Sequence, residues 1–302
     1  MHTTVELNQK GGVGKSGLAA GSSGALIERG RKVLAIDLDP QGHLTTEALG
    51  LREAPSGPDA VNLANALTGD YQGPVRDLLV LHSTHPSGGE LWVLPTTLDM
   101  FLVVRSLYSR VKKMEERLHW LLEALVEEVA AAAGERPFDH AVVDCPPSLD
   151  ILTDNALAAA DAVVIPVEPD RTSIRALRLL LAQIRAVEKE LRIPERRLLG
   201  LVPSRYRRPL AGIDKYVMGE LEALAARGLP IIARLPLAAK VKEAWLKGVP
   251  VTIYAPDAPI SEQYRRVGLV LDIAAGLADV EELRALPELP FEGNLQEEVI
   301  TS

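Results

Sequence analysis

The chain has 302 residues, of which 47% are apolar and 25% are charged, and this composition excludes disordered and fibrous proteins. Its single cysteine, Cys145, excludes a disulfide framework and a multi-cysteine metal cluster within one chain, and it favours a reducing cytoplasm as the location. The net charge of −8 argues, taken as a whole, against a nucleic-acid partner, and no apolar run is long enough to suggest a membrane partner.

Strand-like and helix-like segments alternate from the N-terminus. Residues 4–8 are compatible with a strand, residues 15–29 with a helix that Gly30 ends, and residues 32–36 with a buried strand. Further apolar runs follow at 91–94, 141–143, 162–165, 198–202 and 231–233, with helical stretches between most of them. This order predicts an α/β fold with a mostly parallel, twisted sheet and helices on both of its faces.

Three longer segments complete the predicted organisation. An apolar stripe at three- and four-residue spacing indicates one long helix from about Phe101 to Ala133. Residues 54–73 and 84–89 are rich in Pro, Gly, Ser and Asp, which indicates surface loops around a short helix at 61–67. Residues 279–302 carry seven acidic residues and one arginine, so we expect one domain over residues 1–278 followed by an acidic C-terminal tail.

The strongest signal is a glycine-rich loop between the first strand and the first helix, Lys10-Gly11-Gly12-Val13-Gly14-Lys15-Ser16. Its glycines let backbone N–H groups close around phosphate oxygens, and the helix N-terminus adds partial positive charge. Lys15 can reach the β- and γ-phosphates of a nucleotide, and the Ser16 hydroxyl can bind Mg²⁺. The loop therefore predicts a site for nucleotide phosphates.

This loop departs from the ordinary G-x-x-x-x-G-K-[ST] motif. Gln9 stands where the motif has its first glycine, and a second lysine, Lys10, lies inside the loop. Because a lysine at this place has a long reach but little room to fold back on its own nucleotide, it could extend to a nucleotide held by a second subunit. The alternative is a solvent-exposed lysine with no role.

Three motifs together resemble the ParA family of partition ATPases, which have a deviant Walker A loop and are related to MinD and to the nitrogenase iron protein. They are Asn8–Ser16, Ile36–Gly42 (Ile-Asp-Leu-Asp-Pro-Gln-Gly) and Val143–Leu149 (Val-Asp-Cys-Pro-Pro-Ser-Leu), and the likeness runs from residue 4 to about 272. The resemblance implies a P-loop NTPase domain that binds ATP and Mg²⁺ and hydrolyses ATP weakly without a partner.

The resemblance also implies a role for individual residues. Lys10 would act across an ATP-sandwich dimer, Lys15 would serve catalysis in its own subunit, and Asp39 would position the attacking water. Ser16, Asp37 and Asp144 would surround Mg²⁺, and both aspartates follow predicted strands, where parallel sheets bind ligands. The residues implied in nucleotide binding are Gly11, Gly12, Val13, Gly14, Lys15, Ser16, Gly17, Pro203 and Pro236.

The helix after the loop differs from the family's usual pattern. Gly17 stands where a threonine is usual, and the missing hydroxyl removes a contact to charged phosphate of about 1.5–3 kcal/mol. Gly21 replaces an asparagine, and with Gly24 the helix holds three glycines, each of which costs up to ~1 kcal/mol relative to alanine. We therefore expect close packing of this helix against another element, with a partner subunit as one candidate.

Positive charge is concentrated in the C-terminal third. Residues 185–266 hold 16 Lys or Arg against 9 Asp or Glu, whereas the rest of the chain holds 17 against 32. Basic side chains along one face bind DNA phosphates without sequence preference, and solvated surface charge is the alternative for each of them. The DNA-binding candidates are Lys240, which matches a basic position in the family's DNA-contacting segment, and Lys242, Arg205, Arg207 and Arg208, of which the arginines could instead contact nucleotide.

The favoured interpretation is an ATP-dependent DNA segregation ATPase that works at the nucleoid. ATP would join two subunits into a homodimer that binds non-specific DNA, and a ParB-like centromere-binding partner would stimulate hydrolysis and release the dimer. Two alternatives stay open: a MinD-like positioning ATPase, for which the acidic tail lacks a basic amphipathic helix, and an ATP-switched scaffold with little hydrolysis. One cysteine per chain excludes an iron–sulfur reductase, because a dimer offers two thiolates to a cluster that needs four.

Overall fold

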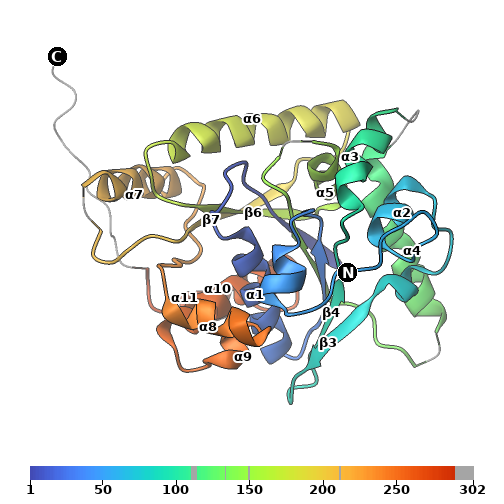
Figure 1. The fold of residues 1–302 in the computed structure, drawn as a ribbon. Helices are drawn as coiled ribbons and strands as arrows, with labels where there is room; N and C mark the ends of the chain where they lie inside the picture. The colour runs from blue at the N-terminus through green and yellow to red at the C-terminus, as the bar shows by residue number, and fades with distance from the viewer. Residues whose placement is uncertain (110–113, 133, 149, 211, 290–302) are drawn as a thin grey trace.

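A computed structural model describes residues 1–109, 114–132, 134–148, 150–210 and 212–289 (Figure 1). Seven strands form one sheet in the order β3-β4-β2-β5-β1-β6-β7. Every neighbouring pair is parallel except β3 and β4, which form an antiparallel hairpin. The strands are β1 (His2–Glu6), β2 (Lys32–Asp37), β3 (Val80–Thr84), β4 (Glu90–Leu94), β5 (His140–Asp144), β6 (Ala162–Val167) and β7 (Arg197–Pro203). The predicted mostly parallel sheet is confirmed.

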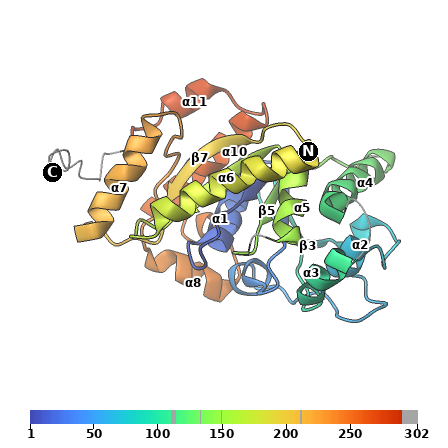
Figure 2. The ribbon, with the colours of Figure 1, turned by 90° about the horizontal axis from the view of Figure 1, so that it is seen from above.

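Helices cover both faces of the sheet, and a separate buried apolar cluster fills the space under each layer. One layer consists of α2 (Leu63–Thr68), α3 (Met100–Ser109), α4 (Arg117–Ala131), α5 (Ile151–Ala159), α6 (Ser173–Leu191) and α7 (Gly212–Ala225). The other consists of α1 (Lys15–Glu28), α8 (Ala239–Lys247), α9 (Val251–Tyr254), α10 (Pro259–Ala274) and α11 (Val280–Arg284). Figure 2 shows α2, α3 and α4 at one end of the molecule and α7 at the other.

Several predicted elements differ in the structure. The single long helix at 101–133 is wrong, because α3 and α4 are separate helices, with a 3₁₀ turn at Met114–Glu116 directly before α4. The Asn155 side chain bonds backbone groups at this break, donating to the Met114 carbonyl (2.7 Å) and accepting from Leu118 N–H (3.0 Å). The first strand begins two residues earlier than predicted, the short helix α2 is confirmed, and β3 was not predicted.

The predicted strand at 231–233 is also wrong. Ile231 makes one parallel bridge to Leu201, and no strand extends from it. A second isolated bridge joins Leu235 to Ser204, with Leu235 N–H donating to the Pro203 carbonyl (2.8 Å), so the segment contacts the β7 region at two separate points without forming a strand.

Close packing explains the glycines of α1. A Cβ atom on Gly21 would lie 2.3 Å from the Tyr264 ring, and one on Gly24 would lie 2.4 Å from Pro250 Cβ. The expected close approach is confirmed, but its partners are α10 and the start of α9 in the same chain, and not a second subunit.

The first part of the predicted acidic tail packs on the domain. Asp279 caps the short helix α11, Glu282 accepts a hydrogen bond from Arg29 (3.1 Å), and the Pro287 carbonyl accepts one from Arg266 (2.9 Å). Residues 290–302 lie outside the described residues, and the domain boundary at 278 stays a prediction. Within the described ranges, no helix combines the length and the hydropathy that a membrane span requires.

Candidate active site

The glycine-rich loop connects β1 to α1 at the carboxyl edge of the sheet. Gly12 (φ 77°) and Gly14 (φ 90°) adopt the left-handed backbone conformation that side chains disfavour, which explains glycine at both positions. Two side-chain hydrogen bonds hold the loop: Ser204 Oγ donates to the Val13 carbonyl (2.5 Å), and Lys15 Nζ donates to the Asn8 carbonyl (3.2 Å). The loop therefore opens onto the N-terminus of α1, as phosphate binding requires.

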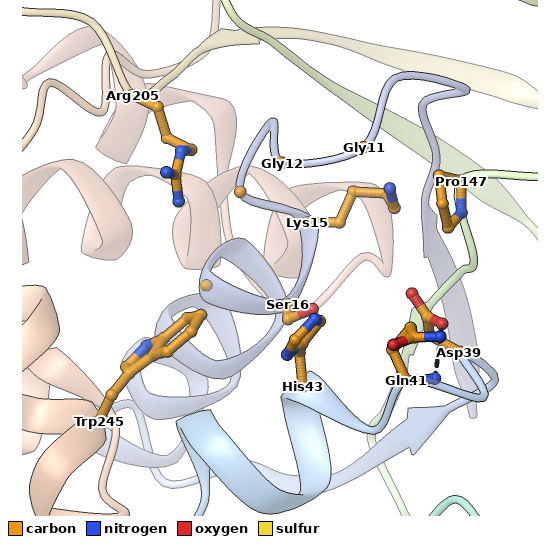
Figure 3. A pocket seen from close by; sticks show the side chains of 12 residues that line it. Gly11, Gly12, Lys15, Ser16, Asp39, Gln41, His43, Pro147, Arg205 and Trp245 are labelled. Atoms are coloured by element: carbon orange, nitrogen blue, oxygen red, sulfur yellow. Dashed lines mark hydrogen bonds between the residues drawn. The ribbon is translucent and has the colours of Figure 1, made fainter. Parts of the chain in front are cut away.

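A cavity of about 280 Å³ lies against this loop (Figure 3). It is lined by Gly11, Gly12, Gly14, Lys15, Ser16, Gly17, Asp39, Gln41, His43, Pro147, Arg205 and Trp245. Three of the predicted nucleotide-binding residues lie elsewhere. Val13 is buried, Pro203 ends β7, and Pro236 lines a smaller neighbouring cavity of about 80 Å³.

Two buried aspartates lie side by side at the ends of β2 and β5, where the strand register pairs Asp37 with Asp144. Asp37 Oδ2 accepts hydrogen bonds from Thr45 N–H (2.8 Å) and Thr45 Oγ1 (2.7 Å), and burial raises the Asp37 pKa to about 7. Burial also raises the pKa of Asp144 well above its usual value, and the Asp37 carboxylate adds to the shift.

The donor atoms near the loop fit Mg²⁺. Neither carboxylate oxygen of Asp144 has a hydrogen-bond partner in the described part of the chain. Mg²⁺ in nucleotide sites takes one or two protein oxygens and completes its shell with phosphates and water. The described residues contain no group of three or more His, Cys, Asp or Glu side chains able to hold a metal ion. Ser16 and Asp144 are the side chains that would hold Mg²⁺, and Asp37, the third predicted residue, lies beside Asp144 in the strand register with one carboxylate oxygen bonded to Thr45.

Asp39 lies at the wall of the cavity. Its side chain Oδ1 accepts a hydrogen bond from Gln41 N–H (2.9 Å), and Thr96 Oγ1 donates to its main-chain carbonyl (3.0 Å), so both ends of the residue are fixed. Asp39 is 6% exposed, and its carboxylate shares the cavity with Lys15. A fixed carboxylate in this position can hold a water molecule near a phosphate.

Lys10 does not line the cavity. Its ammonium donates to Glu168 Oε2 (2.7 Å) and to Asp170 Oδ2, two residues that follow β6. Burial opposes ionisation of Asp170, but the hydrogen bond from Lys10 outweighs burial and, with those from Ser173 and Thr172, lowers the Asp170 pKa to about 2. The sequence interpretation missed both carboxylates, although their place after a buried strand is a signal for the carboxyl edge of the sheet.

The predicted DNA-binding residues come from α8 and from the loop after β7. Lys240 and Lys242 are exposed on α8, where Lys240 Nζ lies 2.7 Å from Glu243 Oε2 and Lys242 borders the smaller cavity. Arg205 also borders the smaller cavity and in addition lines the main cavity, and its backbone is left-handed (φ 58°). Arg207 and Arg208 follow on the exposed loop after β7, with the Arg208 guanidinium 5.9 Å from the Tyr206 ring centre.

The sequence interpretation also missed four residues that line the main cavity. Gln41 and Pro147 lie within the second and third motifs of the resemblance, and His43 directly follows the second, so these motifs could have found them. Trp245 lies on α8, more than 200 positions from the loop, and no motif pointed to it. Cys145 is fully buried, and burial raises its thiol pKa well above the usual value, which agrees with a packing role.

Comparison with known proteins places this geometry in a family. The family model described as an AAA domain matches residues 1–195. The chain is 30% identical over 282 residues to the sporulation initiation inhibitor protein Soj of Bacillus subtilis (89% of this chain and 96% of Soj), and 32% identical over 260 residues to the chromosome partitioning protein ParA of Caulobacter vibrioides (86% and 90%).

A solved structure shares the fold. The cobyrinic acid a,c-diamide synthase of Mycobacterium smegmatis, with a bound ATP analogue and magnesium, is 28% identical with a TM-score of 0.64, over 90% of this chain and 95% of that one. The matching sequence motifs, the loop geometry and these likenesses agree, and the chain belongs to the ParA family of P-loop ATPases.

Proposed function

We propose that this chain is an ATP-dependent DNA partition ATPase. The observation that carries the proposal is the cavity in which Lys15, Ser16 and Asp39 face the same space above two buried aspartates. The relatives named Soj and ParA support the process, because the likeness covers most of both chains.

Phosphoryl transfer requires charge neutralisation and a placed water more than covalent chemistry. Lys15 supplies positive charge to the β- and γ-phosphates, and the backbone N–H groups of the loop hold their oxygens. Mg²⁺, held by Ser16 and Asp144, would supply further neutralisation. Asp39 orients the attacking water from the opposite wall of the cavity.

Dimerisation depends on Lys10. In the structure its ammonium is bound to Glu168 and Asp170, so it must leave these carboxylates before it can contact the nucleotide of a second subunit. ATP with its γ-phosphate offers more negative charge than ADP. Lys10 would exchange its two carboxylate partners for the phosphates of the second subunit's nucleotide. ATP would therefore favour the homodimer more than ADP does.

The exposed lysines of α8 make this helix the best candidate for the DNA-facing element. Lys240 and Lys242 lie on it, and the surrounding residues 185–266 carry a net charge of +7. Two copies in a dimer would bring two such faces to one duplex and raise the avidity for nucleoid DNA. A ParB-like partner would then release the dimer by stimulating hydrolysis. Arg205, from its place in the cavity wall, contacts nucleotide and not DNA.

The test is DNA binding by the full chain with ATP, ADP and no nucleotide, across a salt series. We expect binding only with ATP, a steep loss of affinity with salt, and loss of ATP-dependent binding in Lys10→Ala but not in Arg178→Ala, an exposed arginine on α6 that lies outside residues 185–266. DNA binding that is equally strong with ATP, with ADP and without nucleotide would overturn the proposal. Pelleting with liposomes in ATP would favour positioning at a membrane, and no phosphate release with DNA and partner would favour a scaffold.

A further inference from the structure

Trp245 is an aromatic side chain in the wall of the phosphate cavity. Among the described residues that line that cavity it is the only tryptophan, and it reaches the cavity from α8, across from the N-terminus of α1 (Figure 3). The residue is half-buried, although its neighbour Ala244 is completely buried. Part of the indole therefore stays open to the cavity and is not used to fill the apolar core.

The indole occupies space that Gly17 leaves open. A Cβ atom added to Gly17 would lie 3.4 Å from Trp245 Cζ2 and 3.8 Å from the Tyr264 hydroxyl oxygen. A Cβ alone would meet ordinary van der Waals contact here. A branched side chain would extend about 1.5 Å further and collide with the ring. The indole of Trp245 therefore requires that residue 17 has no large side chain, because both would occupy the same space.

The same indole lines the smaller cavity beside the first one. That cavity is mostly apolar, and Leu235, Pro236 and Val241 form much of its wall. Gly14, Gly17, Arg205 and Trp245 line both cavities, so the two meet at this point. The first cavity, lined by the glycine loop and Lys15, can receive phosphate, and the adjoining apolar wall of the second can lie against a sugar and a planar base.

Helix α8 holds the tryptophan in a fixed position. Its C-terminal Gly248 approaches Gly50 so closely that a Cβ on either would lie 2.8 Å from the other's Cα. His82 Nε2 lies 2.9 Å from the Gly248 carbonyl and 3.2 Å from the Leu49 carbonyl, which ties the helix end to the segment after Asp39. An aromatic ring on a rigid support can bind a planar group at little entropic cost.

We propose that Trp245 is a nucleotide-binding residue of this chain, whose indole contacts the ribose and purine base of the nucleotide at the place that Gly17 leaves open. The inference rests on nucleotide binding at the loop 10–16. It adds a base-side contact that compensates for the hydroxyl missing at residue 17. Because ADP and ATP share the ribose and base, the contact serves both nucleotides equally.

The first experiment compares three probes by calorimetry in the presence of Mg²⁺: ATP, ADP and inorganic tripolyphosphate. In Trp245→Ala we expect about tenfold weaker binding of ATP and ADP, equal to about 1.4 kcal/mol, and unchanged binding of tripolyphosphate, which has no ribose or base. Leu246→Ala is the matched control, because Leu246 is the next residue on α8 and is 87% exposed. Equal weakening of all three probes, or of none, would overturn the inference.

A second measurement does not depend on removing the ring from a folded core. ADP should change the tryptophan emission of the wild-type chain, and Trp245→Phe should abolish that change while Trp92 and Trp120 remain. An emission change that persists in Trp245→Phe contradicts the contact. If the wild-type chain binds neither ATP nor ADP, the proposed function fails instead, so the two failures are distinct.

The third arm tests the pairing of residues 17 and 245. Gly17→Thr alone should weaken ADP binding, because the side chain displaces the indole. In the Trp245→Ala background the same change should strengthen ADP binding, because the threonine hydroxyl then has room to reach phosphate. Effects of the same sign in both backgrounds would count against the shared space.

Discussion

Lys10 Nζ lies 2.7 Å from Glu168 Oε2, within one chain. The lysine that the sequence resemblance assigns to a second subunit is therefore held in its own subunit by carboxylates, with Asp170 as the other partner. The side chains are about a quarter to a third exposed, so each pair is weakened by solvent. The arrangement stabilises the monomer only slightly, which suits a contact that ATP must break.

Removing the two carboxylates should favour the dimer. We expect Glu168→Gln with Asp170→Asn to lower the ATP concentration needed for half-maximal dimerisation by about twofold to thirtyfold, from about 0.2–1 kcal/mol for each of the two partly exposed ion pairs. Light scattering over an ATP titration measures this. Lys10→Ala, in contrast, should abolish dimerisation. A double variant that needs more ATP than wild type would show that these carboxylates serve the dimer itself.

Replacing Asp39 should separate binding from hydrolysis. Asp39→Ala keeps the loop, Lys15 and the buried aspartates, so ATP affinity and dimerisation should stay close to wild type. Loss of the group that orients the water should lower steady-state phosphate release by about 100-fold or more. Glu47→Gln, an exposed acid in the following π-helical segment His43–Ala48, is the control and should keep its rate. Equal rates in the two variants would remove Asp39 from catalysis.

Much of the site could be predicted because its chemistry lies in contiguous motifs. The loop 10–16 and the positions of Asp37 and Asp144 follow from local sequence, since strand ends in a parallel sheet meet at one edge. The position of Glu168 and Asp170 after a buried strand is a signal for this edge of the sheet, but their pairing with Lys10 and the contribution of Trp245 could not be predicted. The chain reaches these positions through β6 and α8, more than 150 residues after the loop. Distances across such crossovers depend on packing that periodicity does not encode.

The fold likewise has elements that the sequence predicts and elements that it does not. Buried central strands such as β5 read as apolar runs, and the structure confirms them. The edge strand β3 is mostly exposed and pairs only with β4, and the apolar run Leu78–Leu81 ends two residues into the strand, so β3 lacks the continuous apolar run of the central strands. The break before α4 depends on the side chain of Asn155, which lies on another helix, and the stripe of apolar residues continues across the break without a signal.

Gly21 should tolerate alanine poorly, because the added Cβ would lie 2.3–2.7 Å from three ring atoms of Tyr264. We expect Gly21→Ala to lower the free energy of unfolding by about 1–3 kcal/mol through overpacking, despite a helix-propensity gain of up to ~1 kcal/mol. Gly17→Ala is the matched control in the same helix and should leave stability unchanged or slightly raised. Urea unfolding measures the free energy of unfolding of both variants, and equal values for the two would contradict the packing argument.

Asp272 should stabilise, in a pH-dependent way, the packing of α10 against the beginnings of β2 and β5. Its carboxylate is completely buried on α10 and bonds Arg29 Nε (2.6 Å), Arg31 Nη2 (3.0 Å) and His140 Nε2 (2.9 Å). Burial opposes ionisation, but the bonds from His140, Arg31 and Arg29 outweigh it and lower the Asp272 pKa to about 2. Asp272→Asn should therefore cost about 1.5–3 kcal/mol at neutral pH, because the half-buried guanidinium groups of Arg29 and Arg31 lose a charged hydrogen-bond partner.

The sign of the pH dependence follows from that lowered pKa. A carboxyl that is more acidic in the folded chain contributes stability above its unfolded pKa, near 3.8, and loses it as pH falls toward 2. The ionisation part amounts to about 2 kcal/mol, so the difference in unfolding free energy between wild type and Asp272→Asn should shrink by about that amount between pH 5 and pH 2.5. Asp257→Asn, at an exposed position, should show no such trend. A wild-type advantage over Asp272→Asn that is constant across this range would mean that folding does not lower the pKa of Asp272, so its three partners do not favour the ionised carboxylate.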